Sequence, residues 1–282
     1  MAMDNQDQID YWNGPAGQKW VDQSDRLDAM LAPFGDEIIA QAAPGADEQV
    51  LDIGCGAGAL TLLASRAAGA VEPGPLGVDV SAPLLELARR RAGEAGLTAR
   101  FEHGDASAFV PDRPADLVIS RFGVMFFADP AAAFGHIAAN VRPGGRMVFA
   151  CWQSLQENDW AFAPLQAALP FLDTPPEPPD PHAPGPFAFQ DRDRLAGLLE
   201  RGGWSNLAID PVETQLVLPG EDIETTAGFM MELGPLSRLL ASQEIDPAPV
   251  EAALAERLSA HQRADGRVVM KSASWRVSAV RR

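Results

Sequence analysis

The feature that most constrains this chain is a glycine-rich turn between an apolar run and a helical pattern. Residues 50–53 are apolar except for Asp52, and then Gly54, Gly56 and Gly58 alternate with small residues before the helical pattern begins. Glycines at such a turn let backbone N–H groups approach a ligand closely, at the positive end of the following helix. The pattern predicts a strand, a tight ligand-binding turn and a helix.

A second acidic residue follows at the spacing expected for a nucleoside site. Asp79 ends the next apolar run, 76–80, and a carboxylate about 20 residues beyond the glycines can bind ribose hydroxyls at the tip of a second strand. Asp52 discriminates between ligands, because it would repel the pyrophosphate of a dinucleotide and attract an ammonium group. S-adenosylmethionine carries an ammonium and no phosphate, so these residues favour it over NAD.

Several motifs together resemble one family. Asp52–Gly58 with Asp79 closely resembles motif I and the acidic loop of the class I S-adenosylmethionine-dependent methyltransferases. Gly104–Ala106 is similar to the loop that carries the family's adenine-binding acid, 114–120 resembles the fourth-strand motif, and 141–146 resembles the turn before the fifth strand. The alternative interpretation, a glycine turn with no ligand, accounts poorly for two correctly spaced acids.

The resemblance implies a set of cofactor-binding residues at the carboxyl ends of the strands. They are Asp52, Gly54, Cys55, Gly56, Gly58, Asp79, Val80, Asp105, Ala106, Ser120 and Arg121. It also implies methyl transfer from S-adenosyl-L-methionine, with S-adenosyl-L-homocysteine as the product.

The alternating apolar runs predict an α/β fold with a parallel sheet and helices on both faces. The resemblance implies that this is a Rossmann-like, seven-stranded, mostly parallel sheet. Strands are expected at 50–53, 76–80, 99–102, 115–120 and 146–151, with helices at 58–68, 82–95 and 130–140. A helix over 192–201 then precedes strands at 206–218 and 267–280, which the resemblance implies form the antiparallel pair that completes the sheet.

The chain is expected to divide into three regions, one of which contains this sheet. They are an N-terminal helical flap (1–45), the Rossmann-like domain (46–221 and 264–282) and a helical cap insertion (222–263). The apolar helical stripes of the insertion could pack on the domain, cover the crevice or form a homodimer contact. The proline-rich segment 164–186 is expected to be an extended loop, either a wall of the substrate pocket or a passive spacer.

Aromatic and methionine side chains indicate the substrate pocket. The candidates are Trp12, Trp20, Phe122, Met125, Trp152, Trp160 and Met230. The N-terminal tryptophans could simply anchor their segment, or they could belong to a flap that closes over the ligands. Aromatic faces suit a sulfonium, because a ring attracts a cation.

No residue stands out as a general base. The candidates are Glu157, Asp159 and His136. The two acids could also be ordinary loop residues, and His136 is better explained as a surface or capping histidine. In-line methyl transfer depends mainly on alignment and exclusion of water, and a base is needed only if the acceptor must first lose a proton. No spacing matches a zinc or iron site, so no metal is expected.

Charge and composition limit the class of molecule that we expect as the methyl acceptor. The chain has 22 Lys+Arg against 39 Asp+Glu, a net charge of −17, which argues against a nucleic-acid substrate. Cys55 and Cys151 are expected to be free thiols, and neither a signal peptide nor a membrane span is evident, which indicates a cytoplasmic protein. We expect a small-molecule O, N, S or C acceptor; the alternatives are a protein or peptide methyltransferase and a nucleotide-binding oxidoreductase.

Overall fold

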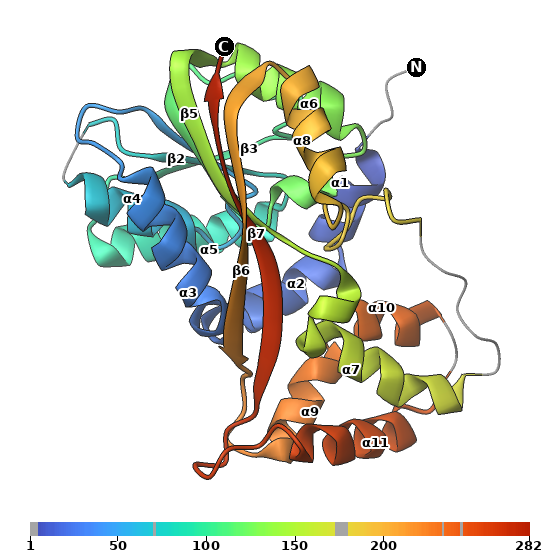
Figure 1. The fold of residues 1–282 in the computed structure, drawn as a ribbon. Helices are drawn as coiled ribbons and strands as arrows, with labels where there is room; N and C mark the ends of the chain where they lie inside the picture. The colour runs from blue at the N-terminus through green and yellow to red at the C-terminus, as the bar shows by residue number, and fades with distance from the viewer. Residues whose placement is uncertain (1–4, 70–71, 173–179, 233, 243–244) are drawn as a thin grey trace.

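The computed structural model describes residues 5–69, 72–172, 180–232, 234–242 and 245–282 (Figure 1). The strands are β1 (Val50–Ile53), β2 (Leu76–Asp79), β3 (Arg100–His103), β4 (Ala115–Arg121), β5 (Val141–Trp152), β6 (Trp204–Val217) and β7 (Val269–Arg281). The helices are α1 (Gln6–Asn13), α2 (Pro15–Asp22), α3 (Ser24–Ala42), α4 (Ala59–Ala68), α5 (Ala82–Ala95), α6 (Pro130–Ala139), α7 (Asp159–Ala168), α8 (Arg192–Arg201), α9 (Ile223–Glu232), α10 (Gly234–Ser242) and α11 (Pro247–Ser259).

The strands form one seven-stranded sheet in the order β3-β2-β1-β4-β5-β7-β6. β1 to β5 pair in parallel, whereas β7 is antiparallel to both β5 and β6. The predicted fold class and the antiparallel pair at the end of the sheet are therefore confirmed. The strand order reverses between β1 and β4, and ligands of open α/β sheets bind at the carboxyl ends of the strands at this point.

Helices cover both faces of the sheet, as the alternating pattern predicts. α3 packs against β4 and β5, while α6 and α8 pack against β5 and β6 respectively (Figure 1). Successive side chains of a strand point to opposite faces. Accordingly Phe149 of β5 stacks with Phe134 of α6, and Trp152 meets Phe34 of α3.

Helices α7, α9, α10 and α11 form a cluster that lies beside the lower part of the long β6–β7 pair (Figure 1). In this helical cluster α11 contacts α7 and α9, and α10 contacts the same two helices. The stripe Val250, Leu254 and Leu258 is fully buried there. α9 to α11 come from the insertion predicted at 222–263, whereas α7 comes from the segment after β5.

α7 corrects the expectation of an extended loop over 164–186. Pro164 lies inside this helix and is buried, and Pro170 lies in a short 3₁₀ turn, Leu169–Phe171. Proline costs about 3 kcal/mol in a helix interior, and packing of the apolar α7 face against α10 and α11 offsets that cost. Pro175, Pro176, Pro178 and Pro179 lie outside the described residues.

Two further features bear on the sequence-based expectations. β5 begins at Val141, not at residue 146, because Val141 pairs with Ala115 ahead of an irregularity in the ladder. Cys55 and Cys151 are buried free thiols, as expected. Within the described ranges, each helix is too short or too polar to cross a membrane.

Candidate cofactor and acceptor site

A cavity opens at the carboxyl ends of β1, β2 and β4, where the strand order reverses. Nine of the predicted cofactor residues line it, namely Asp52, Gly54, Cys55, Gly56, Asp79, Val80, Asp105, Ala106 and Arg121. All seven predicted pocket residues line it too, namely Trp12, Trp20, Phe122, Met125, Trp152, Trp160 and Met230. The topology thus brings together residues that lie far apart in the sequence.

Gly58 and Ser120 are placed differently, outside the lining of this cavity. Gly58 precedes α4 with φ +84°, and a Cβ there would lie 2.9 Å from the Phe101 ring. Ser120 is fully buried, and its hydroxyl donates to the Ile53 carbonyl oxygen at 2.7 Å. Both residues therefore support the structure of the glycine turn through contacts within the protein, and neither lines the cavity.

The glycines of the turn differ in what surrounds them. Gly54 has φ +64°, and a Cβ there would lie 2.7 Å from the Cα of Gly123. Gly56 has φ +52°, and a Cβ there would meet nothing within 4 Å. Gly54 therefore allows two loops to pack closely, whereas Gly56 leaves open space beside its backbone for a ligand.

This difference predicts unequal effects of adding one methyl group. Gly54→Ala should lower the free energy of unfolding by about 2–4 kcal/mol, because left-handed strain adds to a clash with Gly123. Gly56→Ala should cost only about 1 kcal/mol, the strain alone. Urea unfolding of the two variants measures the difference, and equal losses would contradict this description of the turn.

Asp79 is held at the tip of β2 by two backbone groups. Its Oδ2 accepts the Gly56 N–H and its Oδ1 accepts the Ser81 N–H, both at 2.8 Å. Burial raises the pKa of Asp79, and these hydrogen bonds act in the opposite direction. A carboxylate oxygen can accept more than one hydrogen bond, so Asp79 orders the glycine turn and can still accept from ligand hydroxyls.

Asp52 is fully buried at the end of β1, beside the turn. Its Oδ2 accepts from the Thr61 hydroxyl at 2.6 Å, and its Oδ1 has no partner among the described residues. Burial raises the pKa of Asp52 to about 7, although the Thr61 hydrogen bond and the charge of Arg121 oppose the shift. An unpartnered buried carboxylate oxygen is costly; in a cavity wall it indicates a place for a donor group.

Two N-terminal side chains share this property. The buried side-chain oxygens of Asn5 and Gln8 also lack partners among the described residues, and both residues line the cavity. Three unpartnered acceptors around one cavity fit a ligand rich in N–H and O–H donors. The sequence carries no signal for Asn5 and Gln8, because their segment reaches the cavity only through tertiary packing.

The N-terminal segment is attached to the sheet by specific hydrogen bonds. The Asn13 amide donates to the Val80 carbonyl oxygen at 2.8 Å and accepts the Ala82 N–H at 3.0 Å, and the Ser81 hydroxyl donates to the Trp12 carbonyl oxygen at 2.8 Å. The Trp12 ring packs edge-on against Trp20. These contacts place α1 and α2 over the loop that follows β2.

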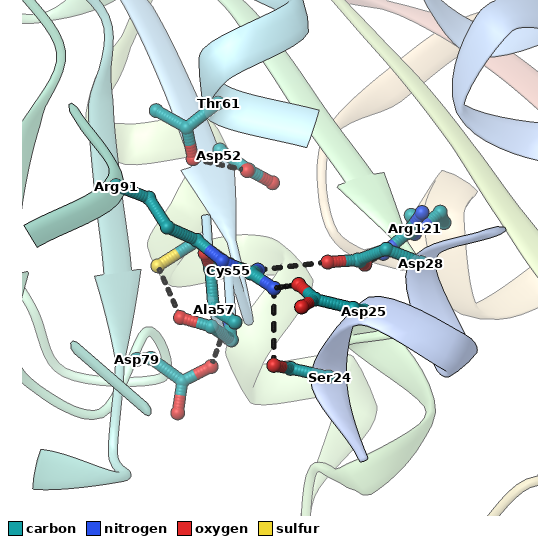
Figure 2. A network of polar contacts seen from close by, with 11 residues as sticks. Ser24, Asp25, Asp28, Asp52, Cys55, Ala57, Thr61, Asp79, Arg91 and Arg121 are labelled. Carbon is teal, nitrogen blue, oxygen red and sulfur yellow. Dashed lines mark hydrogen bonds and ion pairs between the residues drawn. The ribbon is translucent and has the colours of Figure 1, made fainter. Parts of the chain in front are cut away.

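A charged network joins α3 to the site (Figure 2). Arg121 donates to Asp28 Oδ1 at 2.6 Å, and Arg91 donates to Asp28 Oδ2 at 2.8 Å. Arg91 also donates to Asp25 at 2.5 Å, to Ser24 at 3.0 Å and to the Ala57 carbonyl oxygen at 3.2 Å. Figure 2 shows Arg91 between the glycine turn and α3. Of this network only Arg121 could be predicted from the sequence, because its partners come from separate elements.

The three weak candidates for a general base lie outside the cavity lining. Glu157 pairs with Lys271 at 3.1 Å, and the His136 Nε2 lies 2.7 Å from the Phe109 carbonyl oxygen. Asp159 begins α7. Glu157 and His136 thus have partners of their own, and all three residues lie outside the cavity lining.

Comparison with known proteins agrees with this geometry. Residues 50–145 match the family described as a methyltransferase domain. A methyltransferase domain therefore spans residues 50–145, about a third of this chain. The matched residues run from β1 to the turn at the start of β5. They include the glycine turn, Asp79 and Asp105.

Relatives of the methyltransferase domain align over part of their length. An uncharacterised protein of Mycobacterium tuberculosis is 33% identical over 124 residues, 44% of this chain and 44% of the relative. The demethylmenaquinone methyltransferase of Thermus thermophilus is 38% identical over 104 residues, 36% of this chain and 46% of that enzyme. The chain therefore spans less than half the length of these curated relatives.

A solved structure extends the similarity over the whole fold. The magnesium protoporphyrin IX methyltransferase of Synechocystis, crystallised with S-adenosylhomocysteine, aligns with a TM-score of 0.56, covering 99% of this chain and 100% of that one. Its sequence is 15% identical, so this similarity shows that the fold is shared.

Proposed function

We propose that this protein is an S-adenosylmethionine-dependent methyltransferase that acts on a small molecule. The single observation that carries the proposal is the buried Asp52 with an unpartnered oxygen beside the glycine turn. A carboxylate in this position can bind the α-ammonium of S-adenosylmethionine and would repel the pyrophosphate of NAD. The open space beside Gly56 is further support, since the backbone there can approach a ligand.

In this proposal, different residues of the cavity bind different parts of the cofactor. Asp79 would accept from the ribose hydroxyls, and Asp105 would bind the adenine amino group. Asn5 and Gln8 would supply further acceptors from the N-terminal segment. S-adenosylmethionine supplies a methyl group on a sulfonium, whose sulfur is a good leaving group. The chain binds and orients it and excludes water.

Three observations favour a small-molecule acceptor. Residues of α1, α2, α7, α9 and α10 line the cavity together with the ends of the strands, so the site is a concave pocket between several elements. The net charge of −17 disfavours nucleic acid. The demethylmenaquinone and magnesium protoporphyrin IX methyltransferases are named for small molecules. Methylation of a protein or peptide remains the alternative.

Two measurements test the proposal. Isothermal calorimetry should show micromolar binding of S-adenosylmethionine and no binding of NADH; the reverse result would make the protein a nucleotide-binding oxidoreductase. A labelled-methyl screen should then transfer label to a component of a metabolite extract. Labelling of a peptide pool alone would overturn the small-molecule acceptor while leaving the cofactor assignment intact.

A further inference from the structure

The charged groups of the cavity gather at one end. The titratable side chains that line it are Asp28, Asp52, Cys55, Asp79, Asp105 and Arg121. They come from α3 and from the carboxyl ends of β1 to β4, where the cofactor is proposed to lie. Part of the remaining wall is formed by Phe122, Met125, Trp152, Trp160, Phe229 and Met230. We refer to the part of the cavity that these six residues line as the apolar chamber.

Flat rings with defined geometry form one side of the apolar chamber. Phe122 and Trp152 stack with their ring centroids 3.9 Å apart and an interplanar angle of 9°. Phe34 packs edge-on against both rings, and Trp160 is tilted by 49° against Trp152. Aromatic walls of this kind suit a planar apolar molecule.

The backbone at Phe122 indicates that this ring position is functional. Phe122 has φ +64°, a left-handed conformation that a bulky residue rarely adopts. Its N–H donates to the Ala150 carbonyl oxygen at 3.0 Å, and the close approach of Gly54 to Gly123 holds the next residue. Such strain persists where the surrounding structure requires it, and it is common at ligand sites.

The apolar chamber offers no group that could remove a proton. Among the described residues that line the cavity there is no His, Glu, Lys or Tyr. The Trp160 indole N–H is a polar group of the chamber, and it already donates to the Asn158 side-chain oxygen at 3.1 Å. We therefore expect an acceptor in the apolar chamber to lose its proton before the methyl transfer without help from the residues around it, which an aliphatic alcohol does not do at ordinary pH.

We infer that the acceptor is a planar, apolar molecule with a phenolic or enolic hydroxyl that ionises without help from the protein. This inference rests on the proposed function. The hydroxyl proton passes to solvent; the oxygen then forms a bond to the methyl carbon as the carbon–sulfur bond breaks, and that bonding pair goes to sulfur. An anion and a sulfonium thereby become two neutral products. A low-dielectric chamber favours such loss of charge, and it disfavours acceptors whose charge would persist.

A panel of acceptors on one ring skeleton tests the inference with the full chain. The panel contains 1-naphthol, the more acidic 4-nitro-1-naphthol, 1-naphthylmethanol and 1-naphthylmethylamine, each with labelled S-adenosylmethionine. We expect the two naphthols to be methylated at least tenfold faster than the alcohol and the amine. We also expect the pH midpoint of the rate to be lower for 4-nitro-1-naphthol, in step with its own pKa.

Binding supplies a readout that does not depend on turnover. Calorimetry of the S-adenosylhomocysteine-loaded protein should show binding of 1-naphthol that Trp152→Leu weakens about tenfold and Trp152→Phe largely retains. The exposed Leu169→Ala change should have no effect. S-adenosylmethionine affinity and far-UV circular dichroism should remain unchanged in all three variants.

The outcomes distinguish a failure of the proposed function from a failure of the inference about the acceptor. Failure of S-adenosylmethionine to bind would overturn the proposed function itself. Normal cofactor binding would overturn only the inference if the amine or the aliphatic alcohol reacted as fast as the naphthols, or if the pH midpoint were the same for both naphthols. The inference would also fail if the naphthols neither bound nor reacted.

Discussion

The Asp52→Asn variant is expected to be more stable than the parent protein at pH 8 and to bind S-adenosylmethionine more weakly. The unfolded carboxyl ionises near its ordinary pKa of 3.8, whereas burial raises the folded value to about 7. Folding thus favours the protonated form, and stability falls as the pH rises from about 4 to about 7. Above that range the full cost is on the order of 4 kcal/mol, which a neutral amide removes.

The affinity of this variant should change in the opposite direction. Loss of a charge-assisted hydrogen bond to the α-ammonium costs about 1.5–3 kcal/mol, or about 10- to 100-fold in Kd. In the parent protein, cofactor binding near pH 6 should release close to one proton as Asp52 ionises. Calorimetry in buffers with different ionisation enthalpies measures both effects.

A matched variant controls for the removal of negative charge. Asp47 is exposed, so Asp47→Asn should change neither stability nor affinity. Urea unfolding at pH 4 and pH 8 should show a gain for Asp52→Asn only at the higher pH. An equal gain at both pH values, or undiminished affinity, would mean that Asp52 does not have the protonation and ligand role assigned to it.

The Asp79→Ala variant is expected to lose cofactor affinity by about 100-fold or more. Two hydrogen bonds from the ribose hydroxyls to a carboxylate contribute about 1.5–3 kcal/mol each. The substitution also leaves the N–H groups of Gly56 and Ser81 without the acceptor that they have in the structure. The glycine turn should therefore lose order, which lowers both affinity and stability.

Measurement of S-adenosylmethionine and of its ribose-lacking fragment, methionine, separates these two contributions. If Asp79 binds the ribose, Asp79→Ala should weaken binding of S-adenosylmethionine far more than it weakens binding of methionine. The affinity for methionine is measured by its competition with S-adenosylmethionine at millimolar concentration. Glu86→Ala, an exposed change in α5, is the control. Unchanged affinity of Asp79→Ala for S-adenosylmethionine would show that the ribose assignment is wrong.

Local sequence was sufficient to predict the centre of the fold. Glycines between an apolar run and a helical pattern can form few structures other than a strand–turn–helix unit, and the acids of β1 and β2 are adjacent to those turns in the chain. Alternating apolar runs then determine a parallel sheet, since each strand must be buried on both faces. For this reason the parallel sheet and the acids at the ends of β1 and β2 could be predicted from local sequence, whereas the antiparallel end of the sheet and Asp105 followed from the resemblance to a known family.

Tertiary structure alone decided the rest. Arg91 and Arg121 meet Asp28 across separations of 63 and 93 residues, and nothing local to any of the three indicates the contact. Pro164 lies in a helix because packing of α7 outweighs the local cost of proline. Glu157 and His136 have suitable chemistry for a base but do not line the cavity. The sequence by itself determined the central strands, the helices between them and the cofactor motifs, because these depend on neighbouring residues. The helix α7 and the side-chain contacts between distant elements depend on how the whole chain packs.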